Sequence, residues 1–175
     1  MASVINLPRV AVKEWKTEIN PEKAIWICIG EPESSYEAVR NPILDTLPNL
    51  HISFWDLTES VPLLEFNQQE KYGAELLHPP TKEDAKTIVD FVLKHKGKHV
   101  LVNCAAGVSR SSAVAQFCHD MLGYKWMDLG KRVAMPNKVL YKNMKEYYLS
   151  FNPEPFRVID KRERITKEIK PEDIF

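Results

Sequence analysis

At 175 residues and 44% hydrophobic composition, the chain is long enough for one domain with a full apolar core. Its 24 Lys and Arg residues balance 24 Asp and Glu residues, so no net charge attracts nucleic acid or a membrane surface, and no stretch approaches the roughly 20 apolar residues of a membrane span. Cys28, Cys104 and Cys118 show neither disulfide nor zinc spacing. We therefore expect a soluble cytoplasmic monomer without metal or cofactor.

The first half of the chain predicts strands separated by turns. Residues 1–15 favour one or two early strands, interrupted by Pro8. Residues 24–29 are apolar on both faces, which is typical of a central strand in a parallel sheet covered on both sides. A short helix is expected over 34–39, and residues 51–54 predict a third strand.

Asp56 follows this third strand almost directly. An acidic residue just past a strand end lies where an open α/β sheet places its active site. The other interpretation is a turn or helix cap, for which aspartate is also favoured. We interpret Asp56 as a candidate general acid.

A long interval separates Asp56 from the next strongly patterned segments. Residues 59–78 lack a sustained period, and we interpret them as an insertion that forms a lid or a substrate-facing flap. Glu59, Glu83 and Asp84 are rival acids. Asp84 fits a local role better, because residues 81–84 predict a helix start with a capping interaction.

Further along the chain, helical and strand patterns alternate. The helix that begins at Thr81 is expected to run to about His95, with Ile88, Phe91 and Val92 on its buried face. Residues 100–102 predict a buried strand. Residues 111–118 then predict a helix with three apolar side chains at helical spacing, Val114, Phe117 and Cys118.

The end of the chain predicts one more helix. After a turn at Gly123 and the segment 127–133, Met135–Pro136–Asn137 precedes a helix to about Leu149. Residues 153–175 are charged and contain prolines, which indicates a tail. Together these patterns predict a single α/β domain over residues 1–175, with a central, mostly parallel twisted sheet flanked by helices.

The segment between the strand at 100–102 and the helix at 111–118 carries the chemistry. Such a loop directs backbone N–H groups at one spot, where the helix dipole also favours an anion. Arg110 adds a planar fork that can hold two oxygens of a phosphate. Cys104 opens the loop as a nucleophilic thiolate candidate. The small residues between them would line the anion site: Ala105, Ala106, Gly107, Val108 and Ser109.

Cys104 and Arg110 have five residues between them and Ser111 follows, which forms the pattern C-x5-R-[ST]. With a strand before it and a helix after it, Cys104–Ser111 resembles the phosphate-binding loop of cysteine-based protein tyrosine and dual-specificity phosphatases. Residues 54–56, which fit F-x-D, and the Pro136–Asn137 pair resemble small bacterial- or phage-type members. The alternative interpretation of the pattern is a structural one, in which Cys104 is a buried cysteine at a strand end, Arg110 is solvated and neither has a catalytic role.

The resemblance implies a protein tyrosine phosphatase-like fold and a mechanism. Cys104 would form a cysteinyl-phosphate intermediate, Arg110 would hold the phosphate, and Asp56 would protonate the leaving group. Ser111 would hydrogen-bond the Cys104 sulfur. The implied substrate is a phosphotyrosine protein or peptide, with phosphoserine and phosphothreonine as further candidates. Phosphate, sulfate or vanadate would occupy the site, and neither metal nor cofactor is required.

The chain departs from the family pattern at Asn103, where the family usually has a histidine that orders the loop. Asparagine can hydrogen-bond backbone groups but carries no titratable proton. Asn103 and the 59–78 insertion leave open a catalytically weak, phosphoprotein-binding pseudophosphatase. A rhodanese-like or arsenate reductase-like cysteine enzyme is a further alternative, since these use a similar loop.

Overall fold

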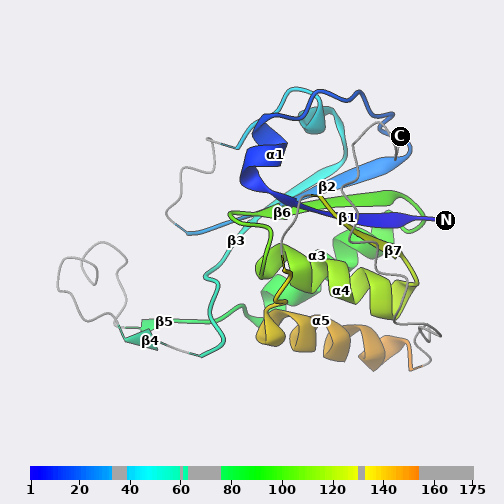
Figure 1. Cartoon of the computed structure of the whole chain (residues 1–175). Helices are drawn as coiled ribbons and strands as arrows, with labels where there is room; N and C mark the ends of the chain where they lie inside the picture. Colours follow the sequence, from blue (N-terminus) through cyan, green and yellow to red (C-terminus); the bar gives the residue numbers. More distant parts are fainter. Residues whose placement is uncertain (33–38, 60, 63–75, 130–132, 154–175) are drawn as a thin grey trace.

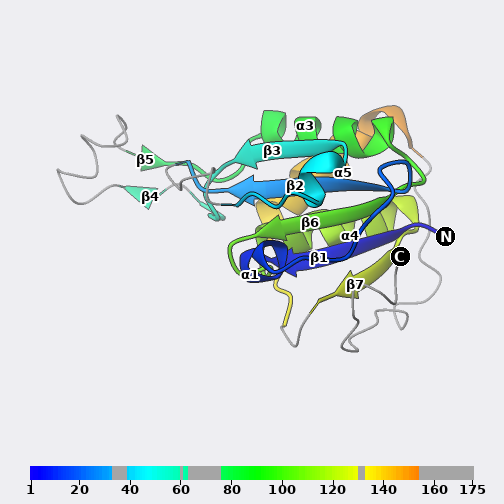
Figure 2. The ribbon, with the colours of Figure 1, turned by 90° about the horizontal axis from the view of Figure 1, so that it is seen from above.

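Five parallel strands form the central sheet of the computed structural model, which describes residues 1–32, 39–59, 61–62, 76–129 and 133–153. Their order is β3-β2-β6-β1-β7, and Figure 2 shows them side by side with their carboxyl ends at one edge. The strands are β1 (Ser3–Pro8), β2 (Ala24–Gly30), β3 (Asn49–Ser53), β6 (His99–Cys104) and β7 (Lys125–Asp128).

Helices cover both faces of this sheet (Figure 1). One face packs against α3 (Lys82–Lys94), α4 (Arg110–Leu122) and α5 (Lys138–Phe151). The other face lies under α1 (Arg9–Lys13) and the 3-10 helix η2 (Leu44–Thr46). The prediction of a single α/β domain with a parallel sheet flanked by helices is therefore confirmed.

The strand β2 shows why the sheet has two covered faces. All seven of its residues are buried, and they alternate between the two apolar clusters on either side of the sheet. Beside it, β6 lies between β2 and β1, with Asn103 opposite Cys28 and Cys104 opposite Pro8. This central position brings the carboxyl end of β6 to the middle of the sheet edge.

Of the one or two early strands expected over residues 1–15, the structure has one, β1. Residues 9–13 form the helix α1, although Val10 and Val12 alternate as in a strand. Pro8 takes an extended conformation just before the helix, and Val12 is fully buried against the sheet while Val10 is 56% exposed. Tertiary packing of one valine thus overrides the strand propensity of both.

The remaining predicted elements agree closely with the structure. Thr81 and Asp84 form a reciprocal capping box at the start of α3, whose buried residues include Ile88 and Val92, while Phe91 is only partly buried. Gly123 ends α4 in the left-handed conformation, at φ 72°. After this turn comes the strand β7, which begins at Lys125, whereas the sequence indicated only a segment over 127–133.

Some predictions fall on residues outside the described ranges. These are most of the helix expected over 34–39, most of the insertion over 59–78, and all of the tail beyond residue 153. Within the insertion, β4 (Val61–Pro62) and β5 (Leu76–Leu77) form an antiparallel pair. No helix in the described part of the chain is long and apolar enough to cross a membrane.

Candidate active site

The loop from Ala105 to Ser109 joins the end of β6 to the start of α4. Cys104, the last residue of β6, is 2% exposed. Gly107 turns the loop at φ 69°, a conformation that glycine adopts without strain. The Arg9 backbone N–H donates to the Ala105 carbonyl oxygen at 3.1 Å, which ties the loop to the end of β1.

Asn6, on β1, holds the loop in place, a role that no pattern in the sequence indicated. Its Nδ2 lies 2.7 Å from the Gly107 carbonyl oxygen, 3.0 Å from Ser112 Oγ and 2.9 Å from Asp128 Oδ1. Ser112 Oγ also donates to the Gly107 carbonyl at 3.2 Å. All of these groups are buried, so the contacts fix the middle of the loop to two strands and a helix.

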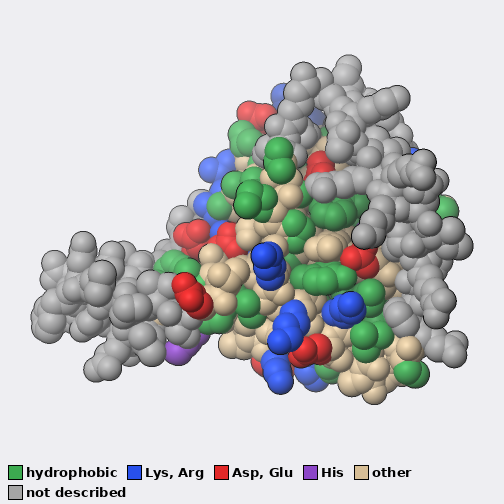
Figure 3. Space-filling model, turned by 60° about the horizontal axis from the view of Figure 1, so that its bottom comes forward, with side chains coloured by type: hydrophobic (Ala, Val, Ile, Leu, Met, Phe, Trp, Pro, Cys, Tyr) green, Lys and Arg blue, Asp and Glu red, His purple; other side chains and the backbone are tan. Residues whose placement is uncertain are grey.

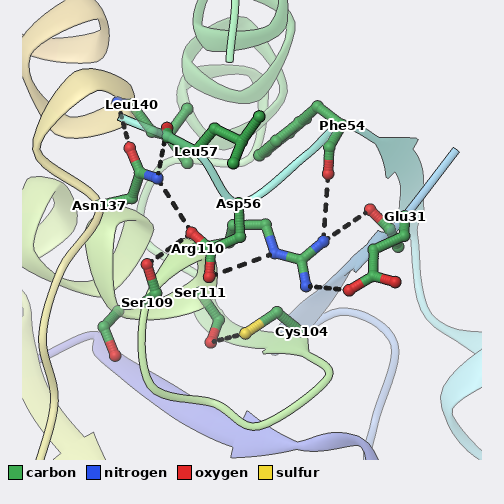
Figure 4. Close-up of polar contacts among 12 residues, drawn as sticks. Glu31, Phe54, Asp56, Leu57, Cys104, Ser109, Arg110, Ser111, Asn137 and Leu140 are labelled. Atoms are coloured by element: carbon green, nitrogen blue, oxygen red, sulfur yellow. Dashed lines mark hydrogen bonds and ion pairs between the residues drawn. The ribbon is translucent and has the colours of Figure 1, made fainter. Parts of the chain in front are cut away.

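Ser111 lies beside the candidate nucleophile. Its Oγ is 3.2 Å from Cys104 Sγ, and its side chain is fully buried in the first turn of α4 (Figure 4). A hydroxyl at this distance can donate to a thiolate, which stabilises the charged sulfur. This is the contact that the resemblance to cysteine phosphatases implies.

Arg110 is held rigidly at the same edge of the sheet. Its guanidinium is almost entirely buried, and Nη1 donates to the carbonyl oxygens of Gly30 at 3.0 Å and Phe54 at 3.1 Å. Nη2 donates to Glu31 Oε1 at 3.2 Å. Nε has no hydrogen-bond partner among the described residues and lies 4.0 Å from Asp56 Oδ2.

These contacts leave one edge of the guanidinium suited to an oxyanion. The carbonyl oxygens at the ends of β2 and β3 fix the Nη1 corner. Among the described residues, the other edge, Nε and Nη2, lies against two carboxylates: Asp56, whose Oδ2 is 4.0 Å from Nε, and the half-exposed Glu31, which accepts from Nη2. Because a buried N–H without a partner is costly, an anion that binds this edge gains a full charge-assisted hydrogen bond from Nε.

Asp56 reaches the site across a long interval of sequence. Its Oδ1 accepts hydrogen bonds from Ser109 Oγ at 2.6 Å and from Asn137 Nδ2 at 3.0 Å. Oδ2 is the oxygen nearer to Arg110 Nε (Figure 4). One oxygen therefore anchors the carboxyl group, while the other remains able to carry a proton. Of the rival acids, Asp84 is engaged in the capping box with Thr81, and Glu83 lies beside it in the first turn of α3.

Asn137 is a second residue whose role at the site the sequence did not reveal. Its Oδ1 caps α5 by accepting from the backbone N–H groups of Val139 and Leu140, while Nδ2 donates to Asp56 and to the Leu57 carbonyl. Its backbone N–H donates to the Ser109 carbonyl at 3.1 Å. One buried amide thus joins the acid, the loop and the last helix. The Pro-Asn pair at a helix start was the signal available.

Asn103 does not have the contacts expected of a loop-ordering residue. Its side-chain Oδ1 accepts from Trp26 Nε1 at 2.8 Å, and Nδ2 donates to Cys28 Sγ at 3.6 Å. Both partners belong to β2, on the sheet face opposite Cys104. Asn103 therefore fixes the end of β6 to β2 and acts on the loop only through the strand.

The other two cysteines lie in the core. Burial raises the pKa of the Cys28 thiol to about 11, although the Asn103 amide partly opposes this. Burial also raises the pKa of the fully buried Cys118 thiol far above its usual range. Both therefore remain protonated, weakly reactive thiols at neutral pH. Among the described residues, no group of three or more His, Cys, Asp or Glu side chains is arranged to hold a metal ion.

Comparison of the chain with family models, with curated proteins and with solved structures finds no match. The likeness to cysteine phosphatases therefore rests on the residues of this chain and their geometry alone.

Proposed function

We propose that the chain is a cysteine-dependent phosphatase that hydrolyses phosphotyrosine in cytoplasmic proteins. Phosphoserine and phosphothreonine are further candidate substrates. One observation carries the proposal: a buried thiol, a guanidinium with an anion-facing edge and a carboxyl group anchored through one oxygen meet at one sheet edge. The three cysteines are free thiols, which fits a reducing compartment.

In the first chemical step, the Cys104 thiolate attacks phosphorus opposite the leaving oxygen. A sulfur–phosphorus bond forms as the phosphorus–oxygen bond breaks, and Asp56 donates its proton to the leaving oxygen. Arg110 and the loop N–H groups stabilise the equatorial oxygens, which carry the charge of the transition state.

In the second step, the Asp56 carboxylate takes a proton from water as the water oxygen attacks phosphorus. The sulfur–phosphorus bond breaks, inorganic phosphate leaves and Cys104 returns as a thiolate. Ser111, 3.2 Å from the sulfur, stabilises the departing negative charge by a hydrogen bond. Asp56 thus acts first as acid and then as base.

The neutral loop supports a singly phosphorylated substrate. Its five residues between Cys104 and Arg110 carry no positive side chain that would bind further phosphates. The thiol-transfer alternative has less support, since enzymes of that kind pass the reaction to a second reactive thiol, and both other cysteines are buried and protonated. The pseudophosphatase alternative predicts anion binding without turnover.

The test is the rate of aryl phosphate hydrolysis against pH, in chelator, for the wild type, Asp56→Asn and Asp84→Asn. We expect Asp56→Asn to lower kcat by about 100-fold, the scale of general acid catalysis. It should also abolish the fall in rate at high pH that marks a group required in its protonated form. Asp84→Asn removes a carboxylate of the same size and should keep the wild-type profile.

Two results would contradict this account. If Asp84→Asn instead abolished the fall in rate at high pH, the assignment of the general acid to Asp56 would be wrong. A wild type that binds phosphate or vanadate but never turns over substrate would establish the binding module instead.

A further inference from the structure

A pocket of about 610 Å³ opens next to the candidate active site. Ser109 and Asn137, the two residues that anchor Asp56, form the wall shared by the pocket and the site. Figure 4 shows Asp56 between this wall and Arg110. Cys104 and Arg110 do not line the pocket, so it is a space beside the phosphate site and separate from it.

The interior of the pocket is effectively apolar. Val108, Met135 and Pro136 supply hydrophobic surface. The two polar side chains of the shared wall are already engaged: Ser109 Oγ donates to Asp56, and both ends of the Asn137 amide are hydrogen-bonded within the protein. Thr58 adds one exposed hydroxyl to the lining, so a polar ligand group finds few partners there, whereas an apolar group gains from burial against Val108, Met135 and Pro136.

Among the described residues that line the pocket, one carries a charge. Lys138, the first residue of α5, is exposed and is the charged member of the lining. Elsewhere on this helix, Lys142 pairs with Glu146 at 3.7 Å, and Figure 3 shows basic and acidic side chains interspersed on the face brought forward there. A ligand in the pocket therefore combines an apolar group with a nearby negative charge that faces Lys138.

We propose that this pocket is a specificity subsite that takes a bulky apolar side chain flanking the phosphorylated residue of a peptide, with an acidic residue beside it facing Lys138. The inference rests on the proposed function, because the shared wall makes the occupant part of the same molecule as the phosphate. A separate occupant would have no reason to lie against the residues that hold the acid. The preferred substrates are therefore phosphopeptides with an apolar–acidic pair near the phosphorylated residue.

The test uses phosphotyrosine peptides of one sequence frame with Leu or Gly at each of the two positions on either side. We expect the wild type to prefer Leu at one position by about 10-fold in kcat/KM, the scale of an apolar pocket. Met135→Ser should bring that ratio close to one. Met135 is 68% exposed, so this change does not empty the core. Val133→Ser, at an 80% exposed position outside the pocket, should keep the full preference.

A second comparison tests the charge. With Asp next to the preferred Leu, Lys138→Glu should lower kcat/KM severalfold, whereas Lys145→Glu, at an exposed lysine of the same helix, should not. Vanadate inhibition of each variant reports the phosphate site separately. Equal rates for Leu and Gly at all four positions, with normal vanadate inhibition, would overturn the subsite and leave the phosphatase proposal standing. Absence of hydrolysis for every peptide, together with absence of vanadate binding in a thermal-shift assay, would overturn both.

Discussion

Cys104→Ser is expected to lower kcat for aryl phosphate hydrolysis by about 10⁴-fold or more, which corresponds to about 5.5 kcal/mol of lost transition-state stabilisation. A serine hydroxyl stays protonated at neutral pH and is a poor nucleophile, so no phosphoenzyme forms. The substitution is nearly isosteric. The serine hydroxyl can keep the hydrogen bond that the Cys104 sulfur makes with Ser111, and the loop contacts of Asn6 do not involve the sulfur. The fold and the affinity for inorganic phosphate should therefore persist.

Initial rates and protection from thermal unfolding by phosphate measure these two properties on the same variant. The matched control is Cys118→Ala. It removes a buried thiol that lies about two helical turns beyond Arg110 on α4 and outside the site. It should keep turnover and lose only some stability from the small cavity. A Cys104→Ser protein that retains substantial turnover would exclude a cysteinyl-phosphate intermediate.

Arg110→Lys should have the second largest effect, lowering kcat/KM by about 10³-fold. A lysine ammonium cannot donate to the Gly30 and Phe54 carbonyl oxygens and at the same time hold two oxygens of a phosphate. The positive charge remains, so the loss reports the shape of the guanidinium fork and not its charge. Inorganic phosphate should also bind more weakly.

The control for this substitution is Arg40→Lys, because the Arg40 side chain is 65% exposed and pairs with Asp45 away from the site. Circular dichroism at the assay temperature checks that Arg110→Lys is folded, since the change also leaves two buried carbonyl oxygens without their donor. If the folded variant stays within about threefold of the wild-type rate, Arg110 does not bind the transition state.

Local patterns predicted the part of the site that is contiguous in sequence. The strand, the loop and the helix around Cys104 follow from patterns within one continuous segment of the chain. The capping box follows from two neighbouring residues, Thr81 and Asp84. Asp56 could be proposed because parallel strands present their carboxyl ends at one edge. Its partners could not be chosen from sequence, because Ser109 and Asn137 lie far along the chain.

The supporting residues depend on contacts between distant segments. Asn6 can donate hydrogen bonds to Gly107 and Asp128 because β1 lies between β6 and β7. No local sequence pattern predicts this strand order. Glu31 contacts Arg110 for a similar reason, since it follows β2, which lies beside β6. These long-range pairings are set by the packing of the whole sheet.

The orientation of Asn103 could have been predicted. Successive side chains of a strand point to opposite faces, so a cysteine that faces α4 places the preceding residue on the other side of the sheet. There Asn103 meets Trp26 and Cys28. The resemblance to cysteine phosphatases implied a loop-ordering role for this position. The alternation of side chains along the strand instead predicts contact with the sheet face opposite Cys104.

The most direct test of the central claim is the mass of the intact protein after an acid quench during turnover of an aryl phosphate. The account predicts an added phosphoryl group, mapped by peptide fragmentation to Cys104, in the wild type. Asp56→Asn should retain the adduct, and Cys104→Ser should lack it. Turnover without any adduct on Cys104, or an adduct on another residue, would contradict the proposed mechanism.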